Sequence, residues 1–212
     1  MARQNYPPYH RVIRVMCSGR VDPLFVLEAF KNGADAVMVG GCKLGECKYM
    51  DGNFQALIMA EMVKNLLRLI GIKEERFTLE WVSSAEPAKL VEDMKKFMLK
   101  VKELGPLGSA EGLSEGDLNF YLDSAIAVCK NMQVRTTYGN IAKELKKLQD
   151  FSEETIKQRV EEKLLPQLRG RLYEIEVKTL IQDGPKSLDY LVSKTKASVD
   201  ELNPILSKLM KT

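Results

Sequence analysis

The chain has 212 residues, of which 45% are hydrophobic and 29% charged, so it is long enough for one large or two small globular domains. Its formal charge of only +3 argues against a nucleic-acid-binding protein, which would carry a strongly basic surface. No run of about 18 apolar residues is present and no signal peptide is recognisable, so the sequence predicts a cytoplasmic protein without a membrane span.

Residues 1–105 alternate between short apolar runs and amphipathic segments. The pattern predicts strands over 12–17, 35–42 and 76–84, and helices over 22–34, 53–72 and 86–105. Pro23 suits the first turn of its helix, Asn53 is the expected N-cap of the next, and Gly71 the expected stop. Strands that alternate with helices predict a small doubly wound parallel α/β sheet with right-handed crossovers.

Three cysteines lie where ligands of such a sheet bind. Cys17 ends the first predicted strand, Cys42 ends the second, and Cys47 lies in the loop that follows. Because ligands of open α/β sheets bind beyond the carboxyl ends of the strands, we expect these thiols to meet at one edge. The fourth cysteine, Cys129, lies in an apolar helical stretch and is expected to be a buried core residue.

Residues 106–212 have a different pattern. After the turn-rich stretch GPLGSAEG, the sequence predicts only helices, so we interpret 106–212 as a separate all-α module. Ser114 and Ser198 are expected helix caps, the latter in a capping box with Glu201, and Pro166 is expected to break or kink a long helix. The last two helices resemble a shortened winged-helix motif, although their near-neutral charge argues against DNA binding.

The spacing of Cys42 and Cys47 leaves several functions open. A C-x4-C pair is one arm of the plant-type two-iron cluster, and thiolates are the ligands of such clusters. Gly41 and Gly45 would let the backbone approach a cluster closely, and nearby basic residues would offset its negative charge. The alternatives are a four-cysteine zinc site, for which C-x2-C pairs are absent, and a regulatory disulfide between Cys42 and Cys47.

Residues 1–105 also resemble a known family. The stretches MCSGRVDP, GADAVMVGGC, GECKYMDGN and LEWVSSAE are similar to the iron–sulfur (delta) subunit of methyl-viologen-reducing, F420-non-reducing hydrogenase. The resemblance implies a flavodoxin-like α/β domain, here lacking its first strand, with a 2Fe–2S cluster. Matched by motif, Cys17, Cys42 and Cys47 are the implied ligands, with Gly41 and Gly45 beside them.

The resemblance further implies a role in anaerobic metabolism. Members of the family pass electrons between a hydrogenase or formate dehydrogenase-type subunit and the flavoprotein of a heterodisulfide-reductase-type complex. The chain would then be a non-catalytic electron-transfer subunit of an oxidoreductase complex, with 106–212 as a docking module.

The expected ligand set is incomplete. Family members begin with another strand and a C-x-x-C stretch, whereas this sequence begins after that point, and three thiols do not fill a four-thiolate shell. The missing ligand would come from another subunit or from residues upstream of Met1. Two further hypotheses stay open: a cluster-free assembly subunit of the same kind of complex, and a thiol redox sensor.

Overall fold

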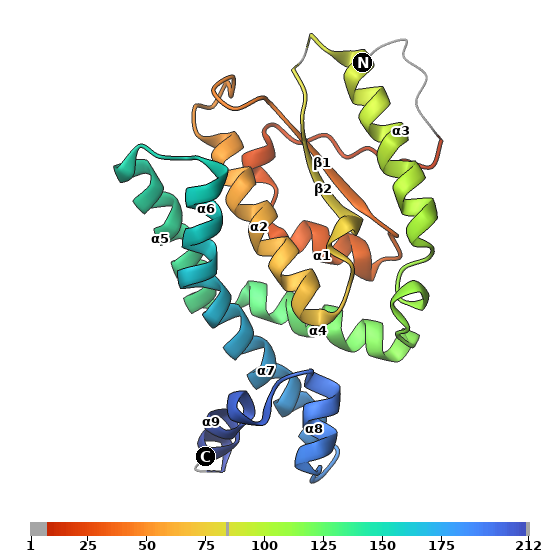
Figure 1. Cartoon of the computed structure of the whole chain (residues 1–212), viewed down its shortest axis with the longest axis vertical. Coiled ribbons are helices and arrows are strands. Elements are labelled where there is room, and N and C mark those ends of the chain that lie inside the picture. The colour runs from red at the N-terminus through yellow and green to blue at the C-terminus, as the bar shows by residue number, and fades with distance from the viewer. Residues whose placement is uncertain (1–7, 84, 211–212) are drawn as a thin grey trace.

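The structure, a computed structural model, describes residues 8–83 and 85–210. Its first half contains two strands that form a parallel pair, with Val37 opposite Phe77 and Gly41 opposite Trp81. The elements of this half, in chain order, are α1 (Pro23–Lys31), β1 (Val37–Gly41), α2 (Gly52–Ile70), β2 (Phe77–Trp81) and α3 (Pro87–Leu104). The predicted α/β class is therefore confirmed (Figure 1).

The first predicted strand is wrong. Residues 10–15 have no regular secondary structure, and Cys17 precedes a short 3₁₀ turn over Ser18–Arg20. Within the described residues only β1 and β2 form a sheet, so no neighbouring strand binds the backbone N–H and C=O groups of this segment. A β-branched run without such a partner does not form a strand, because its backbone groups are better satisfied by water.

Helix α2 is the central element of the first half. Its length and apolar periodicity bury side chains along most of its surface, including Leu66, Leu67 and Ile70. Gly71 ends it in the left-handed conformation (φ 76°), as predicted. The predicted N-cap is wrong, because the helix begins at Gly52 and Asn53 lies inside its first turn.

The described residues of the second half form helices joined by turns and short irregular stretches, with no strand among them. Ser114 caps α4 through its side-chain oxygen, which accepts the backbone N–H of Asp117. The long predicted helix around Pro166 is interrupted by a π-helical turn over Val160–Leu164, and the proline lies in the first turn after it, where its missing N–H is tolerated. The elements are α4 (Glu115–Lys130), α5 (Met132–Leu148), α6 (Glu153–Arg159), α7 (Leu165–Ile181), α8 (Leu188–Thr195) and α9 (Val199–Leu209).

One hydrophobic core spans both halves. It joins buried side chains of α1, α2 and both strands to those of α4, α5, α6 and α7, with Leu27, Leu66, Leu122 and Leu168 all fully buried. Helix α1 packs on α4, and α2 packs on α4, α6 and α7. The change of sequence pattern near residue 106 is therefore not accompanied by a gap in the core.

A buried ion pair fixes the turn-rich stretch between the halves. The Nε atom of Arg76 lies 2.7 Å from a carboxylate oxygen of Glu111, and both side chains are buried, with 0% and 2% exposure. The guanidinium also donates to the backbone carbonyls of Asp35, Gly105 and Pro106. Each buried charge is thus compensated by hydrogen bonds, as a buried pair requires.

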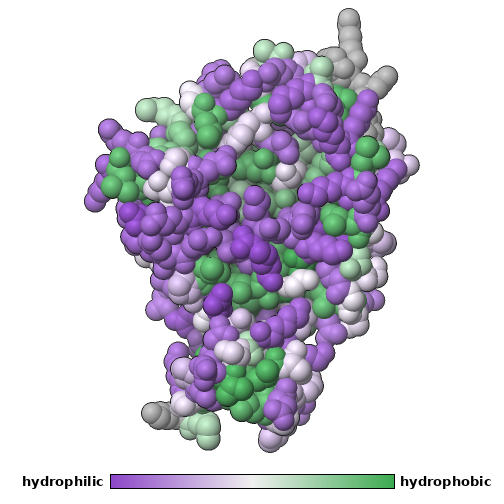
Figure 2. Space-filling view, viewed as in Figure 1, coloured by the Kyte–Doolittle hydropathy of each residue, from purple (hydrophilic) through white to green (hydrophobic). Residues whose placement is uncertain are grey.

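The last two helices form a smaller cluster at one end of the molecule. Figure 1 shows α7 running from the body of the molecule to its lower end, where α8 and α9 lie. Leu202 of α9 is fully buried against Tyr173 and Val177 of α7, and Ile205, Leu206 and Leu209 pack around it. Ser198 and Glu201 form the predicted capping box. The surface seen in Figure 2 is mostly hydrophilic, with an apolar group over this lower end.

Candidate functional site

The structure brings together two of the three predicted thiols. Cys17 follows the irregular N-terminal segment, and Cys47 lies in the loop between β1 and α2, yet their Sγ atoms are only 3.8 Å apart. Neither thiol forms a disulfide, and each is partly exposed. We call Cys17 and Cys47 the thiol pair.

Glycines make the close approach possible. A Cβ atom at position 52 would lie 2.3 Å from Sγ of Cys17 and 3.0 Å from Sγ of Cys47, so the pair occupies the space that any other side chain would fill. A Cβ at Gly19 would lie 2.5 Å from the carbonyl oxygen of Gly52. Sequence reasoning missed Gly52, although it stands in the stretch GECKYMDGN that carries the resemblance.

The N-terminus of α2 favours a thiolate on Cys47. Burial by itself would raise the pKa of this thiol, but hydrogen bonds from the backbone N–H groups of Tyr49, Asn53 and Gly52, and from the Cys17 thiol, bring the pKa below its ordinary value. Gly52 and Asn53 are the first residues of the helix, where free N–H groups and the helix dipole stabilise negative charge.

Cys17 is the partner that keeps its proton longer. Burial raises the pKa of Cys17, a hydrogen bond from the backbone of Gly19 opposes that shift, and the neighbouring Cys47 and Cys42 sulfurs raise the pKa further. The pair therefore loses its first proton from Cys47, and the resulting thiolate accepts a hydrogen bond from the Cys17 thiol.

Cys42 does not join the thiol pair. It is exposed, one residue beyond β1, and no three His, Cys, Asp or Glu side chains among the described residues gather into a group able to hold a metal ion. Gly41 is required for packing, because a Cβ there would lie 2.8 Å from both Oγ of Ser18 and the ring of Trp81. Gly45 has a φ of 83° in open space, so its conformation serves the turn between Cys42 and Cys47.

Three polar contacts hold the cysteine loop in place. Asn53 is fully buried and donates from Nδ2 to the carbonyl of Lys43 at 2.8 Å. The ammonium of Lys43 pairs with Glu86 at 2.8 Å, next to the start of α3, and Asp51 pairs with Lys146 of α5 at the same distance. Lys43, one of the basic residues near the cysteines, has Glu86 as its counter-ion in this structure.

The thiol pair fits one metal atom. Two thiolates on a tetrahedral metal with bonds of about 2.3 Å lie about 3.8 Å apart, which is the distance between the two sulfurs. The described residues thus place two sulfurs at the spacing of two ligands on one metal atom, and no group of three or more His, Cys, Asp or Glu side chains among them could complete a shell. Cys129 lies in the core, as predicted, and burial raises its pKa to about 12, which is unsuitable for a ligand.

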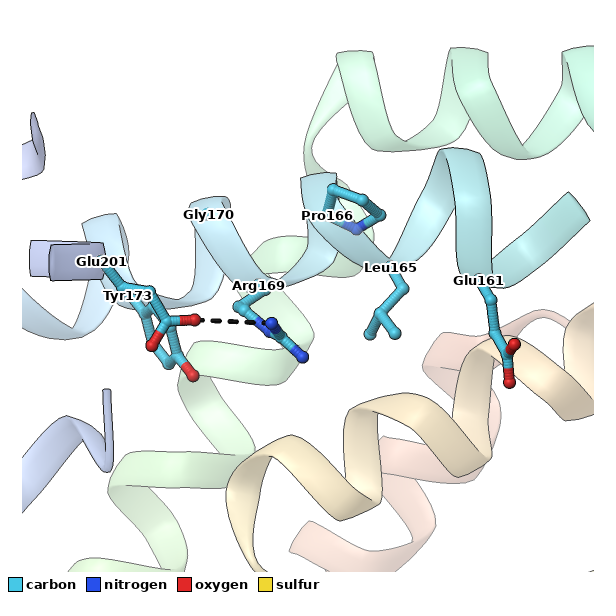
Figure 3. A pocket seen from close by; sticks show the side chains of 7 residues that line it. All are labelled: Glu161, Leu165, Pro166, Arg169, Gly170, Tyr173 and Glu201. Carbon is cyan, nitrogen blue, oxygen red and sulfur yellow. Dashed lines mark hydrogen bonds and ion pairs between the residues drawn. The ribbon is translucent and has the colours of Figure 1, made fainter. Parts of the chain in front are cut away.

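Two hollows on the described surface lie away from the cysteines. One, of about 360 Å³, is lined by residues of the π-helical turn, α7 and α9, with Arg169 and Glu201 paired at 3.4 Å across it (Figure 3). The other, of about 690 Å³, lies between the first turns of α5, the N-terminal half of α7 and the C-terminal half of α9. Neither is lined by a cysteine or histidine.

In the described residues, no helix combines the length and apolar character needed to cross a bilayer.

Comparison with known proteins places residues 1–105 in one family. They match the family model described as the methyl-viologen-reducing hydrogenase delta subunit. The iron–sulfur subunit of the F420-non-reducing hydrogenase of Archaeoglobus profundus is 49% identical over 104 residues, which are 49% of this chain and 76% of that protein. The vhc iron–sulfur subunit of the F420-non-reducing hydrogenase of Methanococcus voltae is 42% identical over 117 residues, covering 55% of this chain and 81% of that protein.

A longer protein contains a similar region. One subunit of the ferredoxin:CoB–CoM heterodisulfide reductase of Methanosarcina mazei is 43% identical over 109 residues, which are 51% of this chain but only 14% of that protein. In that protein the region is therefore covalently joined to a much longer polypeptide.

Proposed function

Because the chain belongs to the family of the methyl-viologen-reducing hydrogenase delta subunit, we propose that it is an electron-transfer subunit that carries an iron–sulfur cluster. Two observations support this function: the relatives that share residues 1–105 are named iron–sulfur subunits, and the thiol pair has the sulfur spacing of two ligands on one metal atom. When bound, such a cluster takes up and releases single electrons. The chain itself then transforms no substrate.

The proposed ligands are Cys17 and Cys47 on one iron, with Cys42 as a third thiolate. The proposed cluster is of the 2Fe–2S type, for which a C-x4-C spacing is one arm. The backbone N–H groups at the start of α2 stabilise a thiolate on Cys47, and Gly41 and Gly45 shape the loop that carries Cys42 and Cys47. A fourth ligand has to come from outside the described residues.

The proposed partners are a heterodisulfide-reductase-type flavoprotein and a hydrogenase or formate dehydrogenase-type subunit. This assignment is supported by the relatives, which are named as subunits of a hydrogenase and of a heterodisulfide reductase. Electrons would enter the cluster from one partner and leave to the other.

The test is anaerobic purification of the complex through a tag on this chain, followed by iron and acid-labile sulfide analysis and EPR spectroscopy. We expect iron in the wild-type complex, loss of the EPR signal on Cys17→Ser or Cys47→Ser, and an altered signal on Cys42→Ser. Cys129→Ser is the matched control and should retain the signal. A wild-type complex without iron, or electron transfer that survives all three ligand substitutions, would instead indicate a cluster-free assembly subunit.

The thiol pair also supports a second candidate function, a dithiol redox sensor. The disulfide considered from sequence joined Cys42 and Cys47, whereas the structure places Cys17 beside Cys47. Transfer of two electrons from the pair to a small-molecule disulfide would form one S–S bond, and that oxidant would be reduced to two thiols with the two released protons. Mass spectrometry after treatment with glutathione disulfide would identify a Cys17–Cys47 peptide, which the iron-loaded protein should not yield.

A further inference from the structure

Exposed apolar side chains lie in the two chain segments that carry the thiol pair. Ile13 and Met16 precede Cys17 and are 85% and 80% exposed, while Tyr49 and Met50 follow Cys47 and are 56% and 78% exposed. The 3.8 Å contact between the two sulfurs brings these two segments of the chain to one place. We call Val12, Ile13, Met16, Tyr49 and Met50 the thiol-pair face. Clustered apolar side chains of this kind mark interaction sites on soluble proteins.

At Met50, part of this face, the backbone adopts a conformation that costs free energy. Met50 has a φ of 65°, in the left-handed region that non-glycine residues rarely adopt. Hydrogen bonds from its N–H to the carbonyl of Cys47 at 3.0 Å, and from the N–H of Asp51 to the carbonyl of Tyr49 at 2.9 Å, close the turn. Strain of this kind is characteristic of functional loops.

Basic residues border the thiol-pair face. Arg11, Arg14 and Arg20 are exposed in the segment around Cys17, and Lys48 is exposed next to Cys47, whereas Glu46 is the exposed acid of the loop. A second copy of the same face would bring these like charges together, which is unfavourable for a symmetric dimer. An acidic surface would be attracted instead.

We propose that the thiol-pair face is the docking surface for a redox partner protein whose contact region has an apolar centre and a border of Asp and Glu residues. This inference rests on the proposed function, because a single-electron carrier has to bring its redox centre against that of its partner. Covering Ile13, Met16 and Met50 would remove water from the surroundings of the sulfurs, and the arginines would set the orientation and speed of association. In the heterodisulfide reductase relative, the region similar to residues 1–105 is covalently joined to a longer chain, which agrees with such a partner.

The proposal is tested by measuring binding of this chain to the purified heterodisulfide-reductase-type flavoprotein of the same organism, anaerobically, by biolayer interferometry. Ile13→Ser, Met16→Ser and Arg14→Glu should each weaken binding by about tenfold or more, and the wild-type affinity should fall with added salt. Leu99→Ser on α3 and Lys130→Glu at the end of α4 are the matched apolar and charge controls, since both side chains are exposed elsewhere. Unchanged affinity in the three face variants, or equal losses in the controls, would overturn the proposal.

Three further measurements separate the alternatives. Iron content and EPR of each variant distinguish loss of docking from loss of a cluster. A variant that keeps its iron but no longer binds the flavoprotein supports the thiol-pair face as the docking surface. A wild-type chain that binds the flavoprotein but contains no iron contradicts the proposed function and leaves the docking surface supported. Light scattering would reveal a dimer broken by Ile13→Ser, which would assign the face to a second copy. The chain can also be sedimented with phosphatidylserine vesicles. If Arg14→Glu abolishes this sedimentation while the flavoprotein still binds that variant normally, the thiol-pair face is assigned to a membrane surface instead.

Discussion

The substitution Glu176→Gln provides a sharp test of the electrostatics of the second half. Glu176 lies on α7 with 1% exposure, and its Oε2 atom has no hydrogen-bond partner among the described residues. Burial raises its pKa to about 8, although the ammonium of Lys196 opposes the shift. Tyr121 and Tyr173 are the other titratable groups whose pKa values respond to its charge. The carboxyl group is therefore mostly neutral at pH 7.

The size of the effect follows from this pKa. Since the folded-state value of about 8 is above the ordinary value of 4.5, ionisation of Glu176 opposes folding. The contribution of the neutral Glu176 carboxyl group to stability is complete below pH 4.5. It declines by about 1.4 kcal/mol per pH unit as the pH rises towards 8. An amide cannot ionise, so between pH 5 and 7.5 the free energy of unfolding of Glu176→Gln should rise by about 3 kcal/mol relative to that of the wild type.

The assay is urea unfolding of both proteins at several pH values, followed by circular dichroism. A relative gain of about 3 kcal/mol corresponds to about 8 °C in thermal midpoint for a chain of this length. Glu174→Gln on the same helix is the matched control, because Lys178, Arg171 and Lys208 hold the pKa of Glu174 at about 2 despite partial burial. Its difference from wild type should stay nearly constant above pH 5.5. A pH-independent difference for Glu176→Gln would refute the reasoning and show that the buried group is ionised and paired.

Three other predictions concern packing and capping. Gly52→Ala would place a methyl group 2.3 Å from Sγ of Cys17, so we expect it to separate the thiol pair, destabilise the chain by about 1–3 kcal/mol and lower the iron content of the complex. Glu111→Gln leaves the buried Arg76 charge without its counter-ion and should cost about 3–5 kcal/mol in urea unfolding, whereas replacing both partners by apolar residues should cost less. Ser198→Ala removes the cap of α9 and should cost about 1 kcal/mol, seen as faster hydrogen exchange in that helix.

Local signals in the sequence were sufficient to predict most helices. Caps, glycine stops and 3.6-residue periodicity are read within one segment, and the structure confirms Ser114, Ser198 and Gly71 in those roles. The strand over 12–17 could not be judged in the same way, because a strand depends on a neighbour that can lie anywhere in the chain or in another molecule. The apolar run VIRV has the composition of a strand, but among the residues that the structure describes no neighbouring strand pairs with it.

The candidate site was predicted only in part, because it too depends on contacts between residues that are distant in the sequence. The structure brings Cys17 and Cys47 together, although Cys17 follows an irregular segment and Cys47 lies in a loop, so the strand ends on which the expectation was based do not account for their contact. The same expectation failed to bring in Cys42, because the loop between Cys42 and Cys47 is held by Asn53 and by the Lys43–Glu86 pair. Those contacts join residues 10 and 43 positions apart. Periodicity and spacing carry no information about contacts of this length, and they also gave no sign that position 52 has to be glycine.

The helical second half has a structural role that its sequence alone does not reveal. The family match ends at residue 105, yet the apolar side of α1 packs on α4, and α2 packs on α4, α6 and α7. The Arg76–Glu111 pair crosses the same boundary in the interior. Since α2 also places the thiol pair at its N-terminus, the helices that bury α2 help to hold the sulfurs in position. Residues 106–212 therefore help to support the thiol pair through their packing on α2.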